Sequence, residues 1–137
     1  MKKILVLVCM VVLAFGFVSC GKDGGGSSYT YQVILDIPGM PVCAPGDGRN
    51  FIVRLIKSGV EVDPGDVTVS TFKDATVGDL KIWNDGGTIN FQGSSITKKY
   101  GEVTGCKVAA LSGSGNFGLK ATYKGITDTV TLTLSNN

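Results

Sequence analysis

Apolar and polar residues alternate along most of this chain from Tyr29 onward. In residues 29–37 the odd-numbered positions carry tyrosine, valine, leucine and isoleucine, whereas Thr30, Gln32 and Asp36 stand at even-numbered positions. Residues 67–72 and 126–134 repeat the alternation. Side chains on a β-strand point to opposite faces in turn, so this period predicts strands that each bury one face. No segment after Tyr29 shows the three-to-four spacing of an amphipathic helix convincingly.

Eight short strands are expected, separated by turn residues. They span residues 29–37, 51–57, 67–72, 80–83, 88–92, 103–111, 117–123 and 126–134, with 60–62 just beyond the second and 103–111 the weakest. Seven or eight strands at intervals of about 8 to 12 residues predict an all-β fold, a β-sandwich with a small barrel as the alternative.

Glycine and proline mark the expected turns. Asp63-Pro64-Gly65-Asp66 and Lys124-Gly125 separate strands, and Asn84-Asp85-Gly86-Gly87 lies between two β-type runs and predicts a hairpin. Glycine inside a strand, such as Gly118, suggests a β-bulge.

The amino-terminal segment has a different character. Lys2 and Lys3 precede an almost unbroken apolar run over residues 4–18, and small Ser19 stands directly before Cys20. This is the layout of a bacterial secretion signal. The run is shorter than the roughly 20 residues that a membrane-spanning helix needs, which disfavours a permanent span.

Residues 17–20, Phe-Val-Ser-Cys, resemble the lipobox of bacterial lipoproteins, and Lys22-Asp23 resembles the export signal of Bacteroidetes-type surface lipoproteins. The resemblance implies that Cys20 is lipidated and becomes the first mature residue. It also implies attachment to the outer membrane and display at the cell surface. We therefore expect a signal peptide over residues 1–19, a lipidated cysteine and Gly/Ser tether over 20–28, and one folded domain over 29–137.

The last third of the chain resembles bacterial immunoglobulin-like domains. The segments that carry the resemblance are residues 101–105, 117–123, 124–127 and 129–134, which close on alternating threonine and aliphatic residues. The resemblance implies an immunoglobulin-like β-sandwich of about seven to eight antiparallel strands. It further implies a non-catalytic module for adhesion, spacing or protein interaction.

Charge and composition argue against several functions. The chain has 13 basic and 11 acidic residues, and loss of Lys2 and Lys3 with the signal leaves the two signs equal, so we expect no nucleic-acid partner. Histidine is absent, which removes the commonest general base and zinc ligand. The carboxylate pairs Asp63 with Asp66 and Asp79 with Asp85 lie in or beside turns. We expect no enzyme activity, no cofactor and no metal site.

Two cysteines remain in the domain once Cys9 leaves with the signal and Cys20 is acylated. An even pair in an oxidising compartment favours a disulfide between Cys43 and Cys106. Two free buried thiols are the alternative.

Binding features are few. Trp83, the only tryptophan, alternates with Leu80 and Ile82 and so is expected to point outward, with core packing as the alternative. With Asn84, Asn90 and Gln92 it forms a candidate glycan contact, which makes a carbohydrate-binding accessory lipoprotein the second functional hypothesis. Finally, Asp128-Thr129-Val130 resembles the short O-glycosylation pattern of exported Bacteroidetes proteins, which makes Thr129 a candidate acceptor.

Overall fold

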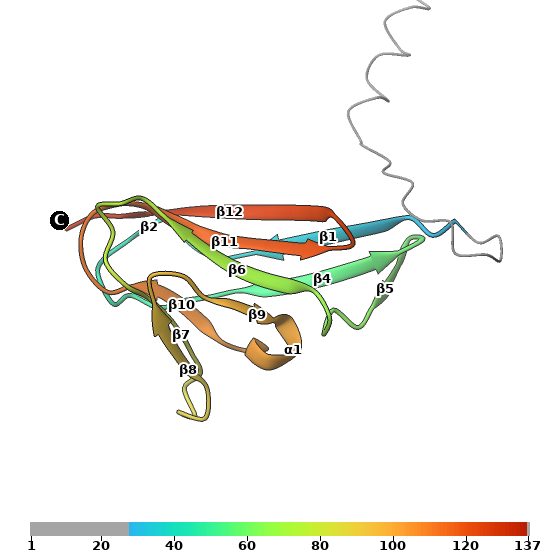
Figure 1. The fold of residues 1–137 in the computed structure, drawn as a ribbon, viewed down its shortest axis with the longest axis horizontal. Coiled ribbons are helices and arrows are strands. Elements are labelled where there is room, and N and C mark those ends of the chain that lie inside the picture. Colours follow the sequence, from blue (N-terminus) through green and yellow to red (C-terminus); the bar gives the residue numbers. More distant parts are fainter. Residues whose placement is uncertain (1–27, 137) are drawn as a thin grey trace, which may run out of the picture.

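The computed structural model of this chain describes residues 28–136, drawn in Figure 1. The predicted signal peptide, Cys20 and the tether as far as residue 27 lie outside the described residues. The described part is mostly β, with one short helix. Its elements are β1 (Tyr31–Asp36), β2 (Val42–Cys43), β3 (Arg49–Asn50), β4 (Ile52–Lys57), β5 (Val60–Val62), β6 (Thr68–Lys73), β7 (Leu80–Trp83), β8 (Asn90–Gly93), β9 (Thr97–Lys99), α1 (Tyr100–Val103), β10 (Lys107–Ala110), β11 (Gly115–Tyr123) and β12 (Ile126–Leu134).

The strands form three sheets. Their orders are β1-β4-β5, β3-β10-β7-β8 and β2-β12-β11-β6-β9, and every pairing is antiparallel except that of β2 with β12. Figure 1 shows the sheet that contains β12, β11 and β6 along the upper side of the molecule, with β4 and β10 below it. The apolar core is made of residues from all three sheets.

Alternation in the sequence becomes alternation in burial. Val33 and Leu35 of β1 are buried while Gln32 is exposed, and Leu132 and Leu134 of β12 are buried while Thr133 is exposed. Each fully buried side chain of this size contributes roughly 1.5–3 kcal/mol through removal of apolar surface from water. The predicted inward faces are therefore confirmed at Val33, Leu35 and Ile37 and at Leu132 and Leu134, whereas Tyr29 precedes β1 and is exposed.

The expected turns also form. β4 and β5 are joined by Ser58 and Gly59, and β11 and β12 by Lys124 and Gly125, all four with positive φ. Two consecutive residues of this backbone conformation match the right-handed twist of the strands that they connect. The hairpin predicted around residues 84–87 joins β7 to β8.

Three details differ from the sequence-based expectation. Residues 103–111 do not form one strand, because α1 ends at Val103 and β10 begins only at Lys107. Both Tyr100 and Val103 of α1 are buried, so tertiary packing stabilises a helix too short to form alone. The short strands β2, β3 and β9 were not expected, because two or three residues carry no readable period.

Gly118 is the third difference. The pairing of β11 with both β12 and β6 runs without interruption through Gly118, so this glycine marks no bulge. A β-carbon here would overlap the carbonyl oxygen of Val130 and the ring of Phe72, which lies opposite on β6. Glycine is required because the backbone and an aromatic ring fill the space that a side chain would occupy.

A buried residue joins the three-stranded and four-stranded sheets, and a side-chain hydrogen bond connects the three-stranded sheet to the five-stranded one. Only Phe51 separates β3 from β4, so residues 49–57 join the three-stranded and four-stranded sheets in one continuous segment. Phe51 is 1% exposed, and its ring packs against that of Tyr100 with centroids 6.3 Å apart. Between the three-stranded and five-stranded sheets, the Leu35 amide of β1 donates to Asp128 Oδ2 of β12 at 2.8 Å.

Over residues 28–136 we find no helix of the length and apolarity that crossing a membrane requires.

Gly118→Ala is predicted to destabilise the domain, because the added methyl group must displace β12 or the ring of Phe72. We expect a loss of about 1–3 kcal/mol, the usual cost of overpacking. Gly86→Ala is the matched control, since the nearest atom to its β-carbon is 3.8 Å away and its φ is not positive. It should change stability by less than about 0.5 kcal/mol. Urea unfolding of both variants measures this, and equal losses would contradict the packing explanation.

Candidate functional site

The outer face of the β3-β10-β7-β8 sheet gathers the polar and aromatic side chains that the sequence singled out. Trp83 on β7 lies opposite Asn90 on β8 and opposite Lys107 on β10, and Lys107 in turn lies opposite Asn50 on β3. Residues directly opposite in an antiparallel pair share a face. Lys81 and Gln92 form the next such pair. We call this surface the Trp83 face, which comprises Asn50, Lys81, Trp83, Asn90, Gln92 and Lys107.

Trp83 is half-buried on this face and lies outside the core cluster. Its indole ring rests on the backbone of Gly48, where a β-carbon would come within 2.7 Å of two ring carbons. The Lys81 ammonium lies 5.1 Å from the ring centroid. The contacts with the Gly48 backbone and with Lys81 therefore hold the ring in place. Because the ring is already ordered, binding a partner through it costs less conformational entropy.

Side-chain amides and one ion pair surround the ring. Asn50, Asn90 and Gln92 are exposed, and each amide offers both hydrogen-bond donors and an acceptor. Lys107 pairs with Asp85 at 2.7 Å. Lys81 has no ion pair among the described residues. The face thus presents an aromatic ring, neutral amides and one uncompensated cation.

Asn84 does not join this group. Its Oδ1 accepts a hydrogen bond from the Ile89 amide at 3.1 Å, and its Nδ2 donates to Thr88 Oγ1 at 2.7 Å. The side chain therefore closes the β7–β8 turn. Of the predicted glycan contacts, the structure brings together Trp83, Asn90 and Gln92 and uses Asn84 within the turn.

The structure adds residues that the sequence did not indicate. Lys107 and Asn50 reach the Trp83 face only through the pairing of β10 with β7 and β3, and Gly48 only through contact with the indole ring. No local pattern encodes pairings over this sequence distance. Lys81 alone was readable in advance, because it stands two residues before Trp83 on the same strand face.

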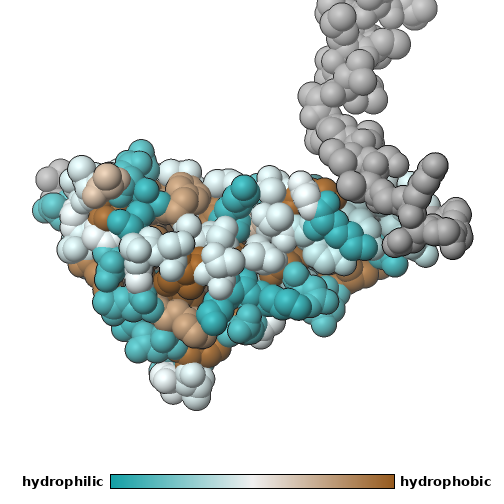
Figure 2. All heavy atoms as spheres, in the orientation of Figure 1, coloured by the Kyte–Doolittle hydropathy of each residue, from teal (hydrophilic) through white to brown (hydrophobic). Residues whose placement is uncertain are grey.

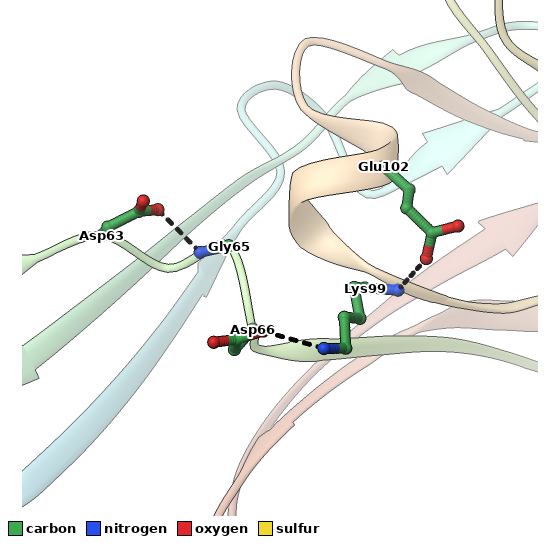
Figure 3. Close-up of polar contacts among 5 residues, drawn as sticks. All are labelled: Asp63, Gly65, Asp66, Lys99 and Glu102. Carbon is green, nitrogen blue, oxygen red and sulfur yellow. Dashed lines mark hydrogen bonds and ion pairs between the residues drawn. The ribbon is translucent and has the colours of Figure 1, made fainter.

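Three of the four carboxylates weighed as catalytic candidates have structural contacts, and one of the three is Asp85, the partner of Lys107. Asp63 Oδ1 accepts from the Gly65 amide at 2.8 Å, and Asp66 pairs with Lys99 at 2.8 Å (Figure 3). The hydrogen bond from Lys99 lowers the pKa of Asp66 below its usual value. Figure 3 also shows Glu102 of α1, whose Oε2 accepts from the Lys99 amide at the start of the helix. These groups hold the β5–β6 turn and α1 in place.

Both domain cysteines are free thiols, so the disulfide predicted between Cys43 and Cys106 is not formed. Cys43 is paired with Leu134 in the five-stranded sheet, whereas Cys106 directly precedes β10 in the four-stranded sheet. Each is buried, and Cys43 Sγ lies 3.7 Å from the Thr133 carbonyl oxygen. The structure therefore agrees with the alternative raised from the sequence, two free buried thiols, and not with the disulfide. An even cysteine count carried no information about which sheet each thiol would enter.

The remaining predicted site residues are Thr129 and Cys20. Thr129 is exposed on β12, and its amide donates to Asp128 Oδ1 at 2.9 Å. Asp128, the first residue of the predicted glycosylation pattern, also accepts the hydrogen bond from the Leu35 amide described above. Glycosylation of Thr129 stays a prediction. Cys20 lies outside the described residues, and its lipidation likewise stays a prediction.

Residues 28–136 contain no group of three or more histidine, cysteine or acidic side chains placed to hold a metal ion. No protein-family model matches the chain, and comparison with curated proteins and with solved structures also finds no match. The functional assignment therefore depends on the chain's own chemistry.

Because both thiols are buried, the domain is predicted to lose stability at alkaline pH. Burial is the largest effect on both cysteines and raises the pKa of each above the ordinary 9.0, although Arg49 acts in the opposite direction on Cys43. Unfolding therefore releases protons above pH 9.0. The contribution of the two neutral thiols to the free energy of unfolding is fully present below that pH and is lost as pH rises through the native pKa values.

Urea unfolding from neutral to alkaline pH measures this loss. The variant with Cys43→Ala and Cys106→Ala serves as the control and should lose less stability with rising pH. Iodoacetamide should modify the native thiols slowly and the unfolded ones fast. If the unfolded, unreduced domain shows no reactive thiol at either position, the two cysteines are bonded and this account of them is wrong.

Proposed function

We propose that this chain is a lipid-anchored, exported and non-catalytic contact module, held at the outer membrane by Cys20 and displayed at the cell surface. The lipobox-like residues 17–20 support the anchor, and the Trp83 face supports the contact role. The single observation that carries the contact role is the half-buried Trp83 ring held against Gly48 on an outer sheet face. Aromatic side chains fixed in this way are frequent anchors of protein interfaces.

An immunoglobulin-like arrangement is part of the proposal, and the strand order supports it. β1, residues 49–57, β10 and β7 follow one another across one layer, and β12, β11 and β6 across the other. This is the order of strands A, B, E, D and G, F, C in immunoglobulin sandwiches. Domains of this architecture present their contact surfaces on sheet faces, edges and loops, and the fold alone specifies no ligand.

Carbohydrate binding is the second candidate, favoured by the amides beside the ring. Asn90 and Gln92 lie on the strand next to Trp83 and on the same face. An indole ring suits the apolar side of a sugar ring, and side-chain amides offer paired donors and acceptors to neighbouring hydroxyl groups. A sugar would stack on Trp83 while the two amides fix its orientation.

Variants of the Trp83 face test the contact role and separate the two candidates. Capture of binding partners on cells and on a panel of polysaccharides is measured for the wild type, Trp83→Ala and Gln92→Ala. We expect Trp83→Ala to weaken binding at least about thirtyfold, as for interface anchors, and Gln92→Ala about fivefold, as for one lost hydrogen bond. Gln32→Ala, at an exposed glutamine of β1 on another sheet, is the matched control and should bind normally.

The emission of the single tryptophan reports which ligand class is bound. A shift on addition of a polysaccharide that requires about fivefold more polysaccharide in Gln92→Ala, but the wild-type amount in Gln32→Ala, indicates glycan recognition. Binding to cells that is Trp83-dependent, combined with unchanged emission across the polysaccharides, indicates a protein partner. Binding that is unaffected by Trp83→Ala would exclude the Trp83 face as the contact surface.

A further inference from the structure

Three tyrosines and two lysines gather at the end of the domain where β1 begins. The rings of Tyr31 and Tyr123 pack with centroids 5.2 Å apart, and Lys124 Nζ lies 4.8 Å from the first and 5.5 Å from the second. Lys57 Nζ lies 3.7 Å above the ring of Tyr29. We call Tyr29, Tyr31, Lys57, Tyr123 and Lys124 the tyrosine–lysine end.

Strand register places this group at one end of the molecule. Tyr31 lies opposite Lys57, which in turn lies opposite Val60, and Tyr123 and Lys124 belong to the β11–β12 hairpin. Figure 1 shows the start of β1, the β4–β5 hairpin and the β11–β12 hairpin together at the right-hand end. In the same view Figure 2 shows hydrophilic and hydrophobic surface interleaved in this region.

The end is amphipathic, and Glu61, which follows Val60 directly, points to another face. Tyr29 is 52% exposed and Val60 65% exposed, and Lys124 is exposed. Glu61 lies opposite Ile56, so it points to the face away from Tyr31, Lys57 and Val60. Neither lysine has an ion pair among the described residues. The exposed surface thus combines tyrosine rings, one aliphatic side chain and two uncompensated cations.

The position of this end in the chain indicates what lies against it. The described residues begin at Ser28, directly before Tyr29, and Cys20 stands eight residues earlier. Eight residues reach at most about 29 Å in any conformation. If Cys20 carries the anchor, as the proposed function holds, Ser28 and the neighbouring tyrosine–lysine end are held within that distance of the anchored cysteine.

We propose that the tyrosine–lysine end rests on the anionic phospholipid surface that holds the lipid anchor. Tyrosine prefers the membrane interface because its ring is apolar and its hydroxyl is hydrated, and lysine extends its ammonium to the headgroups. Each lysine strengthens attachment to an anionic surface by about fivefold. A weak contact suffices, since a short tether keeps the two surfaces at an effective concentration on the order of mM.

Docking in this way orients the Trp83 face. Asn50 and Lys57 are seven residues apart in the segment that joins the sheets, which places them about 23 Å from each other along an extended chain. The Trp83 face therefore lies toward the far end of the domain from the membrane. A domain resting on its tyrosine–lysine end leaves that face accessible to partners outside the cell.

Fluorescent labels on the full lipidated chain test this docking. A thiol-reactive nitrobenzoxadiazole dye is placed at Val60→Cys, beside the tyrosine–lysine end, or at Gly86→Cys, at the tip of the β7–β8 hairpin. Labelling takes place under native conditions, in which Cys43 and Cys106 are buried. The protein is reconstituted into vesicles of phosphatidylethanolamine and phosphatidylglycerol that contain a headgroup nitroxide lipid. The dye at position 60 should be quenched and blue-shifted, and the dye at position 86 should not.

Charge variants test the role of the lysines. Lys57→Gln with Lys124→Asn should lower the ratio of docked to undocked protein about thirtyfold; asparagine suits position 124 because φ is positive there. Lys81→Gln with Lys120→Gln changes the charge equally on other surfaces and should alter docking little. Raising the salt concentration should reduce quenching of the wild type at position 60, which checks the electrostatic contribution without any substitution.

The outcomes separate docking from anchoring. Equal quenching at positions 60 and 86, or quenching at neither, in a chain that carries acyl groups and sediments with vesicles overturns the docking and leaves the anchor intact. A chain whose mass includes no acyl group and that stays in the supernatant overturns the anchor, and the docking with it. Quenching confined to position 60 and sensitive to the two lysines supports both.

Discussion

Phe51 holds the architecture together. It is the single residue between β3 and β4, it is almost completely buried, and it packs on Tyr100 of the only helix in residues 28–136. Through it, residues 49–57 pair with β10 at one end and with β1 and β5 at the other. Removing such a ring usually costs about 3–5 kcal/mol, which is a large part of the stability of a small domain.

The two proposed surfaces lie at opposite ends of this segment. Asn50 belongs to the Trp83 face, and Lys57 belongs to the tyrosine–lysine end. Because one rigid, hydrogen-bonded segment separates them, a domain fixed at one end presents the other at a defined distance and direction.

Much of the fold was readable from the sequence, and the site only in part. Period-two alternation identified the buried faces of β1 and β12, and Lys124-Gly125 identified the hairpin between β11 and β12, because both signals are local. The short helix at Tyr100, the role of Gly118 and the separate burial of Cys43 depend on long-range packing. Trp83 was predicted to point outward from its strand neighbours, whereas its contacts with Gly48 and Lys107 follow from strand pairing that no local pattern encodes.

Labelling of intact cells tests most directly whether an anchored domain presents the Trp83 face outward. The full chain with Gly86→Cys is expressed and exposed to a membrane-impermeant maleimide before lysis. We expect the maleimide to label intact cells and the protein to be in the membrane fraction. In a second variant that also carries Cys20→Ser, the protein should no longer be in that fraction. Labelling that occurs only after lysis, or membrane attachment that persists without Cys20, would contradict the account.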